Sequence, residues 1–238
     1  MKRSRFARPR LLLIGSCLLV VALSVTLSTS VGRAAPAPQM HGHNYGAWSY
    51  TATRSSDHGR LEAAVRYDNS SIAGLRAYAD ANRILANQLA RSSGETEVQI
   101  TFSTPMDPVK FRSWATNVGL TVQAADIRTV NAKGRRSTIA VFPRGSDPLP
   151  QAIIDRQLAR NLTIDPLTIR GVVDARGTID ATRLPSVVAD TNVFLADVTP
   201  SVIRRDLSNE GEVDATQTLV QVQPPFWALE DLGLDNFR

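Results

Sequence analysis

Apolar and polar residues alternate over several short stretches of the chain, which is the pattern of half-buried β-strands. The first two such stretches are LEAAVRY, residues 61–67, and EVQITF, residues 97–102. Between them, apolar residues recur every three or four positions from Ile72 to Leu89, which predicts one long amphipathic helix. The region after residue 60 therefore begins as strand, long helix, strand.

Capping and turn signals divide the rest of the chain. Asp107 and Pro108 supply an N-cap and a first-turn proline for a second helix, which Gly119 ends. The segments after it are predicted, in chain order, as strands at 120–130 and 137–142, a helix that begins at Asp147 and runs to 162, a strand at 168–177, a short helix within 178–190, a strand at 193–198, a partly helical segment at 200–212 and an added strand at 218–223.

The order strand, helix, strand occurs twice, over residues 97–127 and 169–199. Two such units close a four-stranded antiparallel sheet with both helices on one face, which is the ferredoxin-like sandwich. We therefore expect an α+β fold, in which residues 61–238 form one domain around a ferredoxin-like core at 97–199. The long helix at 72–89 is an addition to that core.

The second unit carries a run of apolar, glycine and acidic positions: Gly171, Val172, Val173, Leu184, Val187, Asp190, Val193 and Asp197. In this order it resembles the propeptide inhibitor family of subtilisin-type proteases. The likeness covers residues 97–127 and 169–199 and is interrupted by a hairpin and a helix at 128–168. The resemblance implies the fold more directly than it implies inhibition.

The resemblance also implies a role for the segment after the last strand. In the propeptide family this segment lies in the protease cleft as an extended, substrate-like strand. The corresponding segment here is Pro200–Ser208, in which Arg204 and Arg205 are more typical of a helix face.

The N-terminus has the pattern of an export signal. Five of the first ten residues are basic, and residues 11–32 carry no charge. Such a start places the N-terminus on the cytoplasmic side of a membrane. Residues 1–34 are predicted to be either a cleaved signal peptide or a signal anchor that crosses the membrane through residues 11–32. The rest of the chain is then extracytoplasmic at the cell membrane, or secreted if the signal is cleaved.

The only cysteine, Cys17, lies in this apolar run. We interpret it as a small membrane-buried residue in preference to a lipidated one. Disulfides and thiolate catalysis are therefore excluded from the exported part.

Net charge does not indicate a nucleic-acid partner. The chain has a formal charge of +5 and a pI near 9.9, but six of its 27 basic residues precede Ala35. The remainder has 21 basic and 22 acidic residues, so the exported part is nearly neutral.

Residues 35–60 are rich in Pro, Ala, His, Gly, Ser and Thr, and we predict that they form a flexible tether. They contain all three histidines, His41, His43 and His58. A flexible arm cannot hold a Ser-His-Asp triad in its working geometry. The three histidines are candidate ligands of a Zn or Cu site, and the simpler interpretation is that they are solvated linker residues.

The aspartates do not indicate catalysis. Those that precede a proline, and so are explained by helix capping or turn formation, are Asp107, Asp147 and Asp165. Those predicted to be solvated at strand ends or on a helix are Asp174, Asp180, Asp190 and Asp197. The sequence contains no cofactor motif, so we expect that the protein binds no cofactor and is not an enzyme. A pocket lined by several of these aspartates would instead indicate an enzyme.

Large apolar side chains gather near the C-terminus, after Pro224 and Pro225. The candidate partner-binding residues among them are Phe226, Trp227, Leu229, Leu232 and Phe237. Aromatic anchors dominate interface energetics, so this segment either binds a protein partner or folds back over an open sheet face.

The expected function is that of an exported, membrane-tethered binding protein that acts without catalysis at the cell exterior. The alternative is a propeptide-like inhibitor or folding assistant of a subtilisin-type protease.

Overall fold

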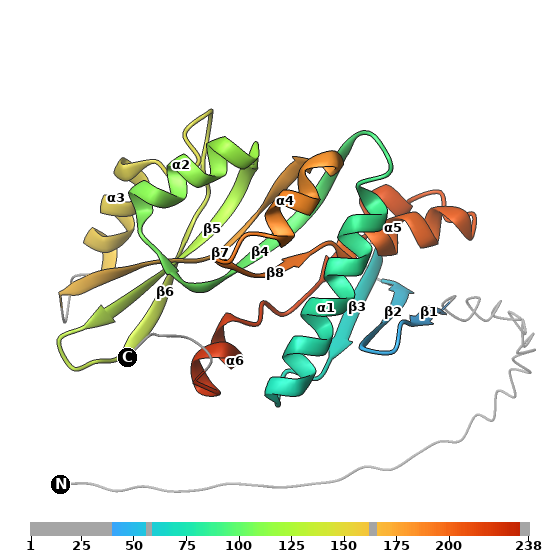
Figure 1. The fold of residues 1–238 in the computed structure, drawn as a ribbon, viewed down its shortest axis with the longest axis horizontal. Coiled ribbons are helices and arrows are strands. Elements are labelled where there is room, and N and C mark those ends of the chain that lie inside the picture. Colours follow the sequence, from blue (N-terminus) through green and yellow to red (C-terminus); the bar gives the residue numbers. More distant parts are fainter. Residues whose placement is uncertain (1–39, 56–58, 162–165, 234–238) are drawn as a thin grey trace, which may run out of the picture. The chain divides into compact units, whose positions relative to one another are not determined.

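Two β-sheets organise residues 40–55, 59–161 and 166–233, which are the residues that the computed structural model describes (Figure 1). The larger sheet contains β4 (Glu95–Met106), β5 (Thr121–Asn131), β6 (Arg136–Val141), β7 (Leu167–Asp180) and β8 (Val193–Asp197). The smaller sheet contains β1 (Met40–Asn44), β2 (Trp48–Arg54), β3 (Leu61–Tyr67) and β9 (Leu219–Gln221). The helices are α1 (Ile72–Leu89), α2 (Pro108–Val118), α3 (Gln151–Asn161), α4 (Leu184–Val188), α5 (Thr199–Asn209) and α6 (Phe226–Asp231), with 3-10 turns η1 (Ala181–Arg183) and η2 (Ala215–Gln217).

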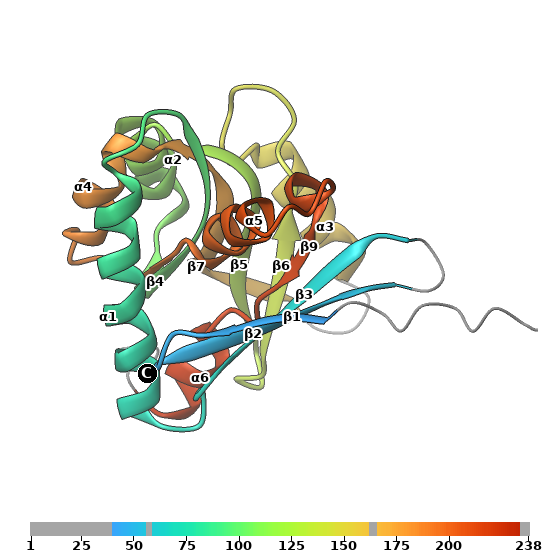
Figure 2. The same ribbon diagram turned by 90° about the vertical axis from the view of Figure 1, so that its right-hand side faces the viewer.

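The strands of the larger sheet are ordered β6-β5-β7-β4-β8, and every neighbouring pair is antiparallel. The smaller sheet has the order β1-β2-β3-β9, and its β3–β9 pair is parallel. In Figure 1, α2 and α4 lie on one side of the larger sheet and α6 lies on the other. Figure 2 shows β9, which is far from β3 in the sequence, lying beside it. The prediction of an α+β fold with an antiparallel sheet and packed helices is confirmed.

Local signals determine the ends of α2, as the sequence predicts. The Asp107 side chain accepts hydrogen bonds from the backbone N–H of Val109 at 2.9 Å and of Lys110 at 3.1 Å. Pro108 occupies the first turn, and Gly119 ends the helix with a left-handed φ of 73°. These contacts satisfy donors that every helix start leaves free, and they orient α2 on the sheet.

The alternating residues of β4 form the core beneath α2. Val98, Ile100 and Phe102 are buried on one face of the strand. The Phe102 ring meets Phe111 and Trp114 of α2 edge-on, with centroid separations of 5.9 and 5.1 Å. Burial of each such side chain contributes about 1.5–3 kcal/mol, so this contact fixes the helix on the sheet.

The prediction of a flexible tether over residues 35–60 is wrong for the part that the structure describes. Residues 40–44 and 48–54 form the β1–β2 hairpin, which pairs with β3 through β2. Trp48, Tyr50 and Ala52 are buried on one face of β2. Their period of two was the missed signal, and it outweighs the Gly and Ser content because the pairing with β3 satisfies the backbone.

The predicted export signal at 1–34 and its apolar span at 11–32 lie outside the described residues. Within the residues that the structure describes, no helix combines the length and the apolar character needed to cross a membrane.

Gly171 occupies a point where β7 comes close to the end of β4. Its φ is +145°, which L side chains rarely adopt. A Cβ atom there would lie 2.6 Å from the carbonyl oxygen of Met106 and 2.8 Å from the carbonyl carbon of Pro105. The same place coincides with a shift in the β4–β7 register, so glycine is required both by its backbone angle and by the neighbouring backbone.

We predict that Gly171→Ala lowers the free energy of unfolding by roughly 3 kcal/mol, because it adds a backbone collision to an unfavourable φ. Gly94→Ala is the matched control, since Gly94 also has a positive φ, +123°, but open space around its Cβ position. Denaturant melts should show a loss of only about 1 kcal/mol for the control. Equal losses in the two variants would contradict the collision.

Candidate functional site

A cleft of about 180 Å³ opens on the face of the larger sheet opposite α2. Gln99 points to this face because its neighbours in β4, Val98 and Ile100, belong to the core beneath α2. The cleft is lined by residues of β4, β5, β6 and β7, by the residue after β6 and by the chain after β9: Gln99, Ala124, Asp126, Ala140, Phe142, Asp174, Arg176, Val222 and Pro224. Residues from separate parts of the sequence therefore meet in one concave surface.

The strand register brings the polar groups of the cleft together. Asp174 of β7 lies directly across from Thr101 of β4 on one side and from Asp126 of β5 on the other. Gln99 is paired in the same way with Arg176. Because residues opposite one another in antiparallel strands share a face, three adjacent strands present their polar side chains to the same place.

Asp174 is the most perturbed acid of the cleft. It is 2% exposed, and it accepts hydrogen bonds from Thr101 Oγ1 at 2.7 Å and from Gln99 Nε2 at 2.9 Å. Burial raises the pKa of Asp174 to about 8, against the opposing effect of the two hydrogen bonds, and nearby Asp126 and Asp197 add to the rise. At neutral pH this carboxyl group therefore holds its proton.

Asp126 differs in its surroundings. Burial raises the pKa of its carboxyl group, but the guanidinium groups of Arg176 and Arg128 act in the opposite direction. A protonated acid and a more easily ionised acid thus lie side by side, with Arg176 at the same wall. This arrangement can donate and accept hydrogen bonds and can attract either sign of charge on a small ligand.

Asp197 lies near this site and has a structural role. The hydroxyl groups of Tyr78 and Thr199 each donate to its carboxylate at 2.6 Å, and the Thr199 N–H donates at 2.9 Å. The Tyr78 ring stacks on Tyr67 at 4.0 Å. Burial raises the pKa of Asp197. These contacts join α1 and β3 to the junction of β8 and α5.

The prediction that Asp174 and Asp197 are solvated is wrong, because they are 2% and 1% exposed. The sequence pattern placed them at solvated strand ends, whereas residues far away in the sequence cover them: Gln99 and Thr101 contact Asp174, and Tyr78 contacts Asp197. Asp180 is exposed, and its side chain accepts from the Thr182 N–H. Asp190 is partly buried and accepts from Trp114 Nε1 at 2.7 Å.

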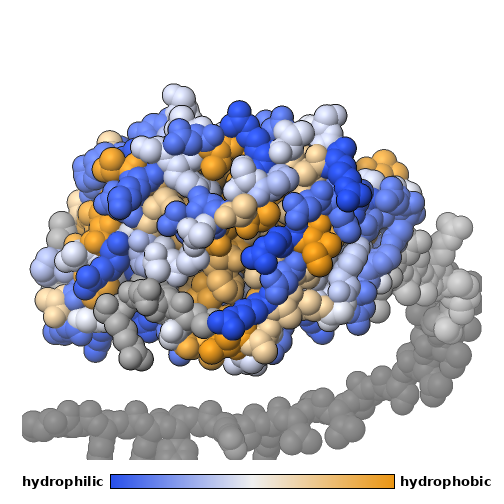
Figure 3. Space-filling model, viewed as in Figure 1, coloured by the Kyte–Doolittle hydropathy of each residue, from blue (hydrophilic) through white to orange (hydrophobic). Residues whose placement is uncertain are grey.

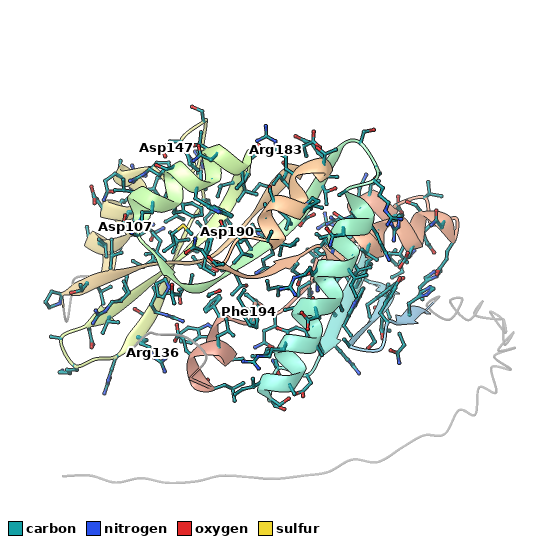
Figure 4. The ribbon with its side chains drawn as sticks, viewed as in Figure 1. Asp107, Arg136, Asp147, Arg183, Asp190 and Phe194 are labelled. Atoms are coloured by element: carbon teal, nitrogen blue, oxygen red, sulfur yellow. The ribbon has the colours of Figure 1, made fainter. Side chains whose placement is uncertain are left out.

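The aspartates that precede prolines stay apart from the cleft. Asp107 caps α2, so that capping prediction is confirmed. Asp147 accepts from the Leu149 N–H at 2.9 Å in a turn, and the helix predicted to begin at Asp147 begins at Gln151 instead. Asp165 lies outside the described residues. Figure 4 shows Asp107, Asp147 and Asp190 at three separate places.

The C-terminal residues predicted to bind a partner fold back onto the domain in part. Phe226 and Leu229 are buried, Leu232 is half-buried, and Trp227 is 39% exposed. Phe237 lies outside the described residues. On the face that Figure 3 presents, polar and apolar side chains are interspersed and no broad apolar patch stands out.

A buried ion pair fixes this fold-back. Glu230 of α6 accepts from Arg128 Nε of β5 at 2.5 Å and from Arg136 Nη1 at 2.8 Å. The Arg128 guanidinium lies over the Trp227 ring, 3.8 Å from its centroid. Figure 4 shows Arg136 close to α6. The chain between β9 and α6 is thereby held across the cleft, where Val222 and Pro224 form part of the wall.

The histidines lie at the opposite end of the described chain. His41 and His43 of β1 contact Glu210 and Glu212, which follow α5. His58 lies outside the described residues. Among the residues with a described placement, no group of three or more His, Cys, Asp or Glu side chains is arranged to hold a metal ion.

Sequence reasoning missed the cleft itself. The available signal was the presence of polar residues on one face of three strands: Gln99 and Thr101, Asp126, and Asp174 and Arg176. Only the register shows that these positions adjoin.

Comparison with known proteins gave no match: no protein-family model, no curated protein and no solved structure is similar to the chain at a significant level.

We predict that Asp174 makes stability fall as pH rises. The folded state keeps the proton up to about pH 8, whereas the unfolded chain releases it near the ordinary aspartate pKa of 3.8. Above that value the unfolded state binds fewer protons, so the free energy of unfolding decreases between about pH 4 and pH 8. Asp174→Asn should remove this dependence and stabilise the protein at pH 8, by an amount on the order of 2–5 kcal/mol.

Thermal or denaturant melts from pH 4.5 to 8.5 test this expectation. Asp80→Asn is the matched control, because Asp80 is exposed on α1 and pairs with its neighbour Arg83. If the Asp174→Asn and parent profiles stay parallel over this range, Asp174 is ionised in the folded protein and the proposed protonation of the site is wrong.

Proposed function

We propose that the chain is an exported binding protein that acts without catalysis on the far side of a membrane, and that its ligand site is the cleft on the larger sheet. One observation carries the proposal: four polar side chains meet in a small concave space, and one of them, Asp174, keeps its proton at neutral pH. The four are Gln99, Asp126, Asp174 and Arg176. Concave sites with a few convergent polar groups and perturbed pKa values are the usual places of ligand binding.

The size of the cleft and the residues at its rim indicate that it binds a small molecule or a single side chain of a larger partner. About 180 Å³ is below the range of about 300–1,000 Å³ that is typical of pockets for drug-sized ligands. Phe142 is 57% exposed at the rim and offers an apolar surface beside the polar floor. A protein partner that inserts one polar side chain would use both features, with Trp227 as a further exposed contact.

The finer fold assignment belongs to the same proposal. The order β5-β7-β4-β8 and the antiparallel pairing are those of a ferredoxin-like sandwich, and β6 then extends the sheet beside β5. The cleft would occupy the sheet face that such a sandwich leaves without helices. The N-terminal residues 1–34 would act as the signal peptide or membrane anchor that delivers this domain.

The propeptide-like inhibitor takes second place among the non-catalytic functions. That function requires Pro200–Ser208 to be extended in a protease cleft. In the folded chain these residues lie within α5, with Pro200, Val202, Ile203 and Leu207 buried. An inhibitor would have to unfold this helix first.

One observation favours a catalytic function in the same cleft. Asp174 keeps a proton near neutral pH beside the more acidic Asp126, which is the arrangement that general acid and base catalysis uses. Turnover of a bound compound would distinguish this function from binding.

Nuclear magnetic resonance of the full chain tests the proposal, with a fragment library that carries ammonium, guanidinium, carboxylate and amide groups. We predict that binders shift the amide signals of Gln99, Asp126 and Asp174. Ala140→Leu should abolish these shifts, because Ala140 lines the cleft and a larger side chain fills it. Ala73→Leu, at an exposed position of α1, is the matched control. Binding that maps elsewhere, or that survives Ala140→Leu, would refute the cleft as the ligand site.

A further inference from the structure

Two histidines of the N-terminal hairpin lie against two glutamates that are about 170 positions away in the sequence. His41 Nδ1 is 2.5 Å from Glu210 Oε2, and His41 Nε2 is 2.9 Å from Glu212 Oε1. His43 Nε2 is 2.5 Å from the other oxygen of Glu210. The period of two places both imidazoles on one face of β1, so the strand meets the Glu-Gly-Glu segment with both side chains.

The geometry at His41 requires a proton on each ring nitrogen. An ionised carboxylate only accepts hydrogen bonds, and a neutral imidazole has only one N–H. With a neutral ring, one nitrogen lone pair of His41 would face a glutamate oxygen without a proton between them. The two contacts are both hydrogen bonds only when the ring is an imidazolium cation.

The charges around the histidines are consistent with the same protonation. The acids that face this part of the hairpin are Glu210, Glu212, Asp206 and Asp214, of which Asp206 accepts from the Tyr45 hydroxyl. The permanent cations are Arg54, which pairs with Glu212 at 2.8 Å and with Asp214 at 3.0 Å, and Arg205, which acts on Tyr45. Four acids thus outnumber two arginines, and two imidazolium groups would make the opposite charges equal in number.

The remaining neighbours are neutral or favour an ionised glutamate. The Tyr50 ring stacks on His43 at 5.6 Å, and burial raises the pKa of its phenol, so it stays uncharged. The hydrogen bond from His43 is the main cause that lowers the pKa of Glu210. Glu210 therefore keeps its charge down to mildly acidic pH.

We propose that the cluster of His41, His43, Glu210 and Glu212 is a pH-sensitive latch, which docks the β1–β2 hairpin on the segment after α5 when both histidines are protonated and releases it when they are neutral. This inference goes beyond the proposed function, because it concerns the hairpin and not the cleft. The hairpin comes soon after the predicted export segment at residues 1–34. The pH outside the cell would therefore determine how firmly the hairpin is held against the rest of the domain.

The direction of the effect follows from the protons that the docked state binds. The docked state holds protons on His41 and His43 that the released state gives up, so a rise in pH favours release. On the acidic side, protonation of Glu210 weakens the latch only below the ordinary glutamate pKa of 4.5. The hairpin should therefore be held more firmly at pH 6 than at pH 8.

Hydrogen exchange of the full chain at pH 6 and pH 8 is the test, corrected for the intrinsic effect of pH on exchange. Protection of β1 amides, relative to those of β4 in the same molecule, is expected to fall roughly tenfold at pH 8. The double variant His41→Gln/His43→Gln should lose this dependence, while Asp80→Asn should retain it. Equal relative protection of β1 at both pH values in the parent protein would overturn the latch.

Two further measurements test the latch if the double variant fails to fold or if the cluster binds a metal ion. In the parent protein, the backbone signals of Gly42 and Thr51 should titrate together with the imidazole signals of His41 and His43. Imidazole titration without any change in the hairpin would overturn the latch. The latch would also be overturned if zinc ions restored β1 protection at pH 8 and a chelator removed it at pH 6. The cluster would then be a metal site.

Discussion

The buried ion pair between Arg128 of β5 and Glu230 of α6 is the contact on which the cover over one face of the larger sheet depends. Both side chains are removed from solvent, and the guanidinium is also covered by the Trp227 ring. Such a pair contributes little net stability, because desolvation offsets the attraction, but the loss of one partner leaves a buried charge and costs about 3–5 kcal/mol. The pair therefore determines where the C-terminal segment lies more than it adds to stability.

The position of this segment changes the chemistry of the sheet. Without it, the face that carries Gln99, Asp126 and Asp174 would be an ordinary polar face in contact with water. With β9 paired to β3 and α6 held on Arg128, Val222 and Pro224 lie at the wall of a cleft. The reduced hydration raises the pKa of Asp174, so the same cover that closes the sheet produces the feature on which the proposed binding site depends. The histidine cluster acts in a similar way at the other end, where charged contacts join β1 to the chain after α5.

The elements that depend on nearby residues could be predicted from the sequence. The Asp107-Pro108 start and Gly119 end of α2, the stripe of α1 and the alternation of β4 all act within a few positions, and each is observed. The hairpin at 40–54 was missed because its composition indicated a tether, while its burial depends on pairing with β3. The burial of Asp174 and Asp197 was missed because it depends on residues far away in the sequence, which leave no trace in local periodicity: Val222 and Pro224 lie in the cleft of Asp174, and Tyr78 contacts Asp197. The contact of His41 with Glu210 spans 169 positions, and neither residue alone indicates it.

The most direct test of this arrangement is hydrogen exchange of Glu230→Gln at neutral pH, with Asp231→Asn as the control, because Asp231 is an exposed neighbour that pairs with Arg136 at 3.6 Å. Loss of the Glu230 charge should leave Arg128 buried without its counter-charge and release the C-terminal segment. We expect α6, β9 and the amides around Asp126 and Asp174 to lose protection, while β4 beneath α2 keeps it. Unchanged protection of α6 and of the cleft strands in Glu230→Gln would contradict the central claim that this pair holds the cover over the sheet.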